Sequence, residues 1–424
     1  RYDLEPFGYV TAAGDVAGFD VDLGRAFAAA WLGDDQAVQF RQVRSDTAIN
    51  HLLAGDVDIV IGALPHTKDR EAAADFGLTY FQDGQALLIR ETDAATITGL
   101  DSLAGIPVGV EAYGDAIDTL QAATPFTSTF TTYTRFDEAV EGLRWGEVGA
   151  VADMRHRLFW GHALLPETRI VAQYTQSPIA FAYPQNDPFF ADLVNLTFQA
   201  LVADGTYADL YTTWFDGEAP PAIQIWPGDE VPTLANTPLV DTVPNTSGAI
   251  QARGRLVVAL VDHTPFAYLD ENGTATGYEV NLVQQLAQRW LGSGEAIDFI
   301  PTSIDEGYTM LQTGQADLMI GGLVHSRAAE MEIDFSPTMY IAGESLMVQA
   351  GTVITGLANL DGQQVAVVQG SPSGDILLAA AQAAGAAVTI LPQSSLDAAI
   401  AEMEAGRVIA VAGDRADLIG AAYA

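Results

Sequence analysis

The chain has 424 residues, 49% of them apolar, so it is long enough to fill more than one domain core. Its 55 acidic and 18 basic residues give a formal charge of −37, which repels phosphate backbones and argues against nucleic acid as a partner. The absence of cysteine excludes disulfides, thiolate metal sites and cysteine nucleophiles. No apolar run approaches the roughly 18 residues of a transmembrane helix.

A repeat with a spacing of 259 residues organises the sequence. Gly18-Phe19-Asp20 returns as Gly277-Tyr278-Glu279. The same spacing joins Pro6-Phe7 to Pro265-Phe266, Gly55 to Gly314, Asp58 to Asp317, Gly62 to Gly321, His66 to His325, Phe76 to Phe335 and Trp31 to Trp290. Repetition over this length indicates a duplication, so the function must be explained for two related units.

The sequence of the first unit predicts alternating strands and helices. In chain order they are a helix over 21–32, a strand over 38–43, a helix capped by Asp46, strands over 57–61, 86–89 and 107–110, helices over 116–122 and 137–145, strands over 150–152 and 179–183, and a helix over 189–204. This order is typical of doubly wound α/β sheets, whose ligands gather at the carboxyl ends of strands.

Residues 218–253 carry repeated prolines and predict a semi-rigid linker. The second unit, 254–424, then repeats the scheme. It predicts helices over 280–291, 305–312 and 396–405 and strands over 255–261, 316–320, 345–348, 365–368 and 409–412. The strand over 255–261 has no full counterpart before Pro6, and counterparts of 165–215 are absent after Ala424. We therefore expect the sequence to be a fragment of a longer chain.

These motifs together resemble the bacterial extracellular solute-binding proteins of family 3, the polar amino-acid binders of ABC importers. The matching pieces are Pro6-Phe7, 18–23, 55–58, 67–70, Asp75-Phe76, 103–105, 205–207 and Trp214-Phe215. They cover nearly all of the first unit and the second unit up to Asp414.

The resemblance implies tandem periplasmic-binding-protein type II units, each a Venus flytrap of two doubly wound α/β lobes joined by a two-strand hinge. In the first unit, 1–217, the lobes would be 1–92 with 181–217, and 97–177. The crossings would lie near 90–96 and 176–179. In the second unit, which lacks its C-terminal part, the lobes would be 254–350 and 355–424.

An amino-acid ligand needs a cation for its carboxylate and an anion for its ammonium group. The resemblance places the first role on Arg70, in the motif Thr67-x-x-Arg70, and the second on Asp153 or, in the second unit, Asp414. A structural salt bridge is the competing interpretation of Arg70. The other candidate ligand-binding residues are Phe7, Pro65, His66, Tyr113 and Gly114 in the first unit, and His263, Phe266, His325, Ser326, Arg327, Gly370 and Ser371 in the second.

Several positions depart from the family pattern. Pro65 and Val324 replace a hydroxyl residue, Leu4 and His263 replace a stacking aromatic, and Ala329 stands where the second unit's clamp arginine would be. A third interpretation is therefore kept, in which the second unit is a structural partner that binds no ligand.

We predict a non-enzymatic, cofactor-free extracytoplasmic protein, periplasmic or at the cell surface. It is expected to bind a small polar solute, an amino acid or a related carboxylate, by Venus-flytrap closure for the permease of an ABC importer. The turn 370–374 fails the Gly-x-Ser-x-Gly pattern, and the six histidines form no metal motif. The main alternative is the ligand-sensing region of a transmembrane receptor or histidine kinase. A cyclohexadienyl dehydratase-like lyase with Glu111 as a base is the weaker one.

Overall fold

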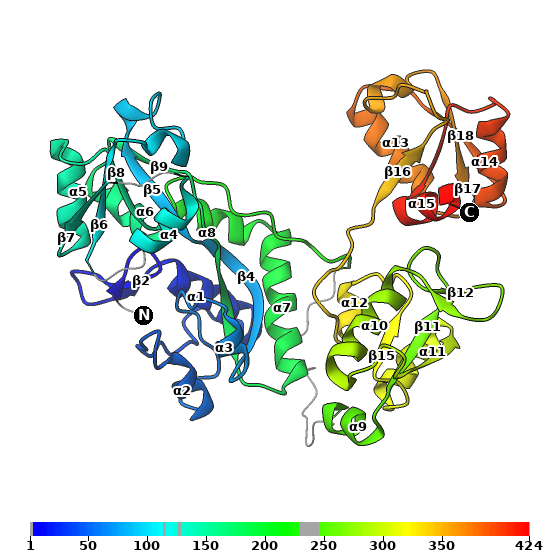
Figure 1. Cartoon of the computed structure of the whole chain (residues 1–424), viewed down its shortest axis with the longest axis horizontal. Coiled ribbons are helices and arrows are strands. Elements are labelled where there is room, and N and C mark those ends of the chain that lie inside the picture. The colour runs from blue at the N-terminus through cyan, green and yellow to red at the C-terminus, as the bar shows by residue number, and fades with distance from the viewer. Residues whose placement is uncertain (1–2, 113–115, 126–128, 229–245, 424) are drawn as a thin grey trace. The chain divides into compact units, whose positions relative to one another are not determined.

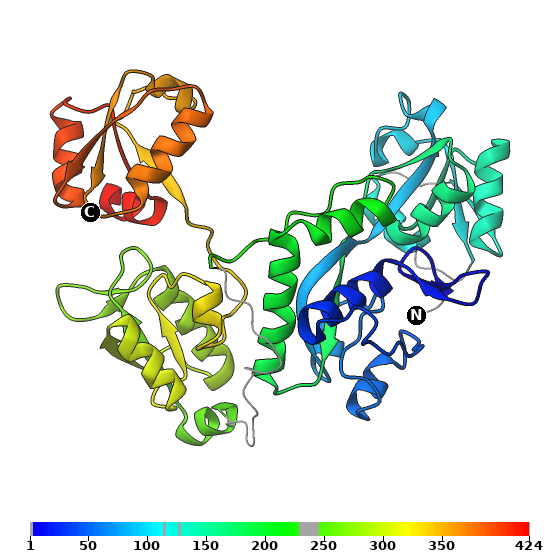
Figure 2. The ribbon, with the colours of Figure 1, turned by 180° about the vertical axis from the view of Figure 1, so that it is seen from behind.

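The computed structural model describes residues 3–112, 116–125, 129–228 and 246–423. The chain forms two compact units (Figures 1 and 2). The first contains Arg1–Val243 with Ser326–Met331, and the second contains Pro244–His325 with Glu332–Ala424. Within the described residues, no helix is both long and apolar enough to cross a membrane. Tyr113 and Gly114 lie outside the described residues.

The first lobe of the first unit is built on a long antiparallel strand pair. β4 (Asp75–Asp83) pairs with β10 (Ser177–Tyr183), with Ser177 opposite Asp83 and Tyr183 opposite Asp75. The other elements of this lobe are β1 (Asp3–Leu4), β2 (Gly8–Val10), β3 (Val16–Ala17), α1 (Phe19–Leu32), α2 (Ala48–Leu53), α3 (Lys68–Glu71), α7 (Pro188–Ala203) and α8 (Thr206–Trp214). Helices α1, α7 and α8 contact one another, and α7 packs on β4.

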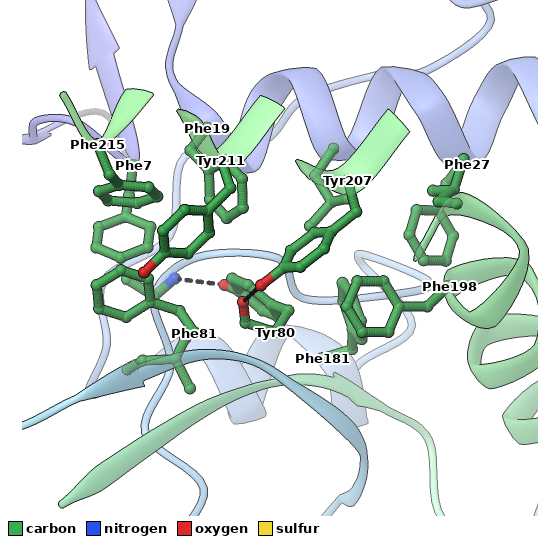
Figure 3. Close-up of a cluster of buried hydrophobic side chains, with 14 of the residues drawn as sticks. Phe7, Phe19, Phe27, Tyr80, Phe81, Phe181, Phe198, Tyr207, Tyr211 and Phe215 are labelled. Carbon is green, nitrogen blue, oxygen red and sulfur yellow. Dashed lines mark hydrogen bonds between the residues drawn. The ribbon is translucent and has the colours of Figure 1, made fainter. Parts of the chain in front are cut away.

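Aromatic rings fill this lobe (Figure 3). Phe19, Leu23 and Phe27 recur at helical spacing on α1 and are buried against rings from β4, β10 and α8. Two buried phenols are held by backbone groups. Tyr207 donates to the carbonyl of Tyr80 at 2.6 Å, and the Tyr80 hydroxyl accepts from Ala63 N at 3.2 Å. Burial raises the pKa of both phenols, so both stay neutral.

The second lobe of the first unit is a five-stranded sheet in the order β7-β6-β8-β5-β9. Its strands are β5 (Gln85–Arg90), β6 (Pro107–Glu111), β7 (Thr129–Tyr133), β8 (Ala150–Met154) and β9 (Thr168–Val171). Its helical segments are η1 (Glu91–Asp93), η2 (Leu100–Leu103), α4 (Ala116–Ala123), α5 (Phe136–Trp145) and α6 (Arg155–Leu164). Residues of α5 and α6 pack on one face and those of α4 on the other, which is the doubly wound arrangement.

β4 continues into β5 of the second sheet (Figure 1). Gly84 lies between these two strands, so the chain crosses between the sheets there. Gly84 has φ 153°, and a Cβ built there would lie 2.0 Å from the Thr175 carbonyl oxygen of the returning crossing. Only glycine suits this conformation and this approach. The sequence predicts the first crossing later, over 90–96. The difference arises because β5 pairs with β8 and β9 and so belongs to the second sheet.

The second unit begins with a parallel sheet in the order β14-β11-β15. Its elements are α9 (Thr246–Arg253), β11 (Leu256–Val261), β12 (Tyr268–Leu269), β13 (Ala275–Thr276), α10 (Tyr278–Leu291), β14 (Ile297–Thr302), α11 (Ile304–Gln312) and β15 (Leu318–Ile320). The sequence predicts a linker up to residue 253. The last part of that stretch is α9, because the prolines end at Pro244.

A mixed sheet in the order β16-β19-β17-β18 forms the rest of the second unit. Its elements are β16 (Glu344–Met347), η3 (Leu357–Leu360), β17 (Gln364–Val368), α13 (Ser373–Ala383), β18 (Thr389–Gln393), α14 (Leu396–Glu404), β19 (Ala410–Asp414) and α15 (Arg415–Tyr423). Gly343, the repeat counterpart of Gly84, also has φ 153°. The short helix α12 (Arg327–Glu330) groups with the first unit.

Two strands predicted in the first unit are not regular strands. Residues 38–43 have no regular structure, and 57–61 contribute only an isolated bridge between Val60 and Ala182. In the second unit, strands near the equivalent positions, β14 and β15, both pair with the central β11. No strand takes the place of β11 among the described residues of the first unit, so these apolar segments have no parallel partner.

Candidate functional site

Arg70 lies on α3, which follows the loop after residues 57–61 of the first lobe. Thr67 caps this helix, accepting from Arg70 N at 3.4 Å. The guanidinium donates from Nη1 to the Pro65 carbonyl at 2.7 Å and from Nη2 to Ser45 Oγ at 3.4 Å. Pro65 thus contributes its backbone, while Ser45 is a partner that the sequence did not indicate.

The described residues provide no carboxylate that balances the charge of Arg70. Within the described part of the chain, no acidic group lies within ion-pair distance of its guanidinium. Partial burial lowers the pKa of Arg70, but an arginine stays protonated at neutral pH. In a chain with 55 acidic residues, a half-buried arginine whose described partners are neutral is well placed to bind an external carboxylate.

The two equivalent histidines stack on the two equivalent phenylalanines. The His66 ring lies parallel to Phe76 with centroids 4.4 Å apart, and His325 lies parallel to Phe335 at 4.5 Å. His66 Nε2 also lies 2.5 Å from Glu71 Oε2. An open depression of about 410 Å³ beside α3 is lined by His66, Thr67, Lys68, Glu71 and Ala72. The stacks on Phe76 and Phe335 give both histidines a structural role.

A second charged group lies at the carboxyl ends of β6 and β8, which run parallel in the second lobe. Arg157 Nη1 lies 2.5 Å from Glu111 Oε2 and 3.0 Å from Asp153 Oδ2, and its guanidinium covers the Phe136 ring at 4.7 Å. Burial raises the pKa of Asp153, and the charge of Arg157 opposes that rise. Arg157 was not among the candidates, although its spacing of four residues from Asp153 was a readable signal.

Asp153 and Asp414 occupy different positions in their sheets. Asp414 lies opposite Glu344 in the ladder of β16 and β19, and the residue opposite Gln85, the counterpart of Glu344, is Met154. Asp153 therefore corresponds to Gly413. Because neighbouring strand residues point to opposite faces, Asp153 shares the face of Val151, beneath α5 and α6, whereas Asp414 shares the face of Ala412, beneath α13.

The second unit brings His263 and Phe266 together. Their rings are 5.3 Å apart, and the Phe266 ring meets Tyr340 edge-on at 5.2 Å. His263 Nε2 lies 2.9 Å from Asp417 Oδ1 on α15, so this pair joins the two lobes of the unit. Gly370, with φ 85°, and Ser371, whose Oγ donates to the Val368 carbonyl at 2.8 Å, form a turn after β17.

Two further candidates are buried in packing contacts. Phe7 is fully buried among Phe19, Phe81, Phe215 and His156. Arg327 is 4% exposed and donates to the Gln199 carbonyl at 3.1 Å within the first compact unit. Ser326 caps α12 by accepting from Ala329 N at 3.2 Å, and the Ala329 side chain is buried. These residues therefore have structural partners in the protein itself.

The first turn of α6 attaches the second lobe of the first unit to the first lobe. His156 Nδ1 lies 2.5 Å from Asp83 Oδ2 at the end of β4. Arg155 pairs with Glu218, donates to the Tyr211 hydroxyl at 3.3 Å and lies over the Phe159 ring at 4.8 Å. These contacts, which sequence spacing did not indicate, hold the lobes together near the Gly84 crossing.

The two-lobed α/β architecture of the first unit, with its two crossings, and the recurrence of its elements in the second unit define a tandem of type II periplasmic binding protein units. The chain belongs to the bacterial extracellular solute-binding proteins, family 3, whose model matches residues 1–217 and 256–373.

Named relatives cover about one unit. The ABC transporter glutamine-binding protein GlnH of Bacillus subtilis (strain 168) is 25% identical over 217 residues, which are 50% of this chain and 78% of that protein. The glutamine-binding protein of Geobacillus stearothermophilus is 29% identical over 164 residues, 38% of this chain and 62% of that protein. Among solved structures, an ancestral cationic amino acid solute binding protein (AncCDT-1) is 27% identical with a TM-score of 0.45, over 50% of this chain and 92% of that chain.

Proposed function

We propose that this protein binds a small polar solute, an amino acid or a related carboxylate, outside the cytoplasm, and that the first unit does so through Arg70. The observation that carries this proposal is the half-buried Arg70, whose described partners are a carbonyl and a hydroxyl and not a carboxylate. Family membership and the two glutamine-binding relatives support the ligand class.

The chemistry follows from the guanidinium fork. Arginine presents several N–H donors in one plane and binds a carboxylate with two parallel hydrogen bonds. The contacts to Pro65 and Ser45 fix the fork in position before the ligand arrives, which lowers the entropy lost on binding. Because the Ser45 hydroxyl and the Pro65 carbonyl are uncharged, they do not neutralise the positive charge of Arg70, which can pair with the carboxylate of the ligand.

Closure of the lobes provides the binding mechanism. A ligand that contacts both lobes stabilises the closed state by its differential affinity for that state. Gly84 and the contacts of Arg155 and His156 lie at the crossing between the lobes, where such a rotation would pivot. The protein would act by binding, without chemistry on the solute.

We further propose delivery to the permease of an ABC importer, since one relative is an ABC transporter glutamine-binding protein. The first unit is the better candidate for carboxylate binding, because the second unit has the buried Ala329 in the place of Arg70.

The test is Arg70→Ala in the whole chain, screened by thermal shift and calorimetry against amino acids and small carboxylates. Loss of a charge-assisted bidentate contact should weaken binding about 100-fold or more. A ligand at a hundredfold excess over Kd stabilises by about 2.7 kcal/mol, so this shift should vanish. Arg44→Ala is the matched control, because Arg44 is a nearby exposed arginine paired with Asp46. Equal affinity of wild type and Arg70→Ala would contradict the proposal.

A further inference from the structure

At the end of β8, the described residues of the first unit offer a ligand no free carboxylate at the position where the repeat counterpart has Asp414. In the second unit, Asp414 ends β19, and the contact described for its carboxylate is from Ala416 N at 2.7 Å. The ladder counterpart in the first unit is Met154, whose side chain carries no charge. The nearby Asp153 lies one residue earlier and on the opposite face of the sheet.

The carboxylate of Asp153 is already bound by a cation of the protein. Its side chain is 10% exposed, and Arg157 bridges it to Glu111 at 3.0 and 2.5 Å. The Arg157 guanidinium is further held over the Phe136 ring. An ammonium group of a ligand that paired with Asp153 or Glu111 would have to displace Arg157 from that carboxylate, and breaking this partly buried ion pair is unfavourable.

We propose that Arg157 determines the ligand specificity of the first unit, which takes small carboxylates without a free α-ammonium group in preference to the corresponding α-amino acids. This inference rests on the proposed function, because Arg70 supplies the carboxylate contact. Arg157 takes the role of an internal cation that satisfies Asp153 and Glu111 whether or not a ligand is present. The ligand then needs one charged end and not two.

The experiment measures matched pairs by calorimetry on the whole chain: L-glutamine with glutaramate, L-glutamate with glutarate, and L-leucine with isocaproate. The des-amino member of at least one pair should bind about tenfold tighter than the amino acid. That binding should be lost in Arg70→Ala, which assigns the signal to the first unit.

Two variants test the role of Arg157. Arg157→Gln frees both carboxylates and should move the affinity ratio about tenfold toward the amino acid. Asp153→Asn keeps the shape of the side chain and its acceptor oxygen, so it is the more conservative change if Arg157→Gln does not fold by circular dichroism. It should leave the affinity for the des-amino acid unchanged and should not weaken amino-acid binding.

A wild type that binds the amino acids more tightly than their des-amino counterparts would overturn the inference, and loss of amino-acid binding in Asp153→Asn would then identify Asp153 as the ammonium partner. That result would leave the proposed function intact as long as Arg70→Ala also lost binding. If Arg70→Ala changed the affinity for none of the carboxylates, the proposed function would be overturned, and this inference with it.

Discussion

The two halves of the molecule contain nearly the same helix in different surroundings. α1 and α10 each have 14 residues, begin after a glycine and end at a left-handed glycine. Phe19 on α1 is fully buried, whereas its counterpart Tyr278 on α10 is 46% exposed. The difference comes from α7 and α8, which cover α1 and for which the described residues of the second unit provide no counterpart. A helix is thus specified locally, but its burial depends on elements far away in the sequence.

Strand formation in the two units also depends on distant elements, and each unit has a strand that the other lacks. β4 is a nine-residue strand in the first unit because β10 pairs with it. Its counterpart in the second unit, residues 334–342, lacks regular strand structure, and Met339 and Tyr340 are partly exposed there. Conversely, β11 organises β14 and β15 in the second unit, while residues 38–43 and 57–61 of the first remain irregular. In each half, an apolar segment becomes a regular strand only where a partner strand is present.

The largest expected contrast is between Phe19→Ala and Tyr278→Ala. The first change removes a ring packed against Phe7, Tyr211 and Phe215 and should lower the free energy of unfolding by about 3–5 kcal/mol. The second removes a half-exposed ring and should cost within about 1 kcal/mol. Urea denaturation followed by circular dichroism measures the change in the free energy of unfolding for each variant. Hydrogen exchange of α1 and α10 measures the change in each helix separately. Equal costs would show that distant packing does not distinguish the two helices.

A smaller contrast is expected between the two crossing glycines. Gly84→Ala would place a Cβ against the Thr175 carbonyl and should destabilise by about 3 kcal/mol, combining the clash with the cost of a positive φ. Gly343→Ala meets no atom within 4 Å, so only the backbone cost of about 1–2 kcal/mol should remain. The difference in denaturation midpoint between the two variants is the observable. If Gly343→Ala cost as much as Gly84→Ala, the tight approach at the first crossing would be irrelevant.

The smallest contrast concerns the paired tryptophans. Trp31 Nε1 donates to Thr197 Oγ1 on α7 at 2.8 Å, whereas Trp290 is 56% exposed. Trp31→Phe should cost about 0.5–1.5 kcal/mol through the lost hydrogen bond, and Trp290→Phe close to nothing. The fluorescence that each variant loses is the contribution of the replaced tryptophan. Quenching of these two contributions by iodide gives an independent check, since Trp290 should be more accessible to iodide than Trp31. A more accessible Trp31 would contradict the described packing of α1 on α7.

The candidate site was predictable where the pattern is local. The motif from Thr67 to Arg70 fixes a capped helical turn, so the position of Arg70 on that turn follows from neighbouring residues. Ser45 lies 25 residues earlier, in a segment without regular structure, and its contact with Arg70 has no sequence signature. The burial of Phe7 likewise depends on Phe215 at the far end of the unit. The sequence identifies the chemical group, but its partners come from folding.

The sequence by itself determined the duplication, the α/β alternation, the family resemblance and the arginine of the Thr-x-x-Arg motif, because these depend on residue order and short-range periodicity. Only the tertiary structure decided that the crossing is at Gly84, that Asp153 and Asp414 emerge on opposite faces, and that Arg157 neutralises Asp153. The reason is that strand register and ion pairing depend on which distant segments meet. A shift of one residue along a strand is enough to turn a side chain to the other side of its sheet.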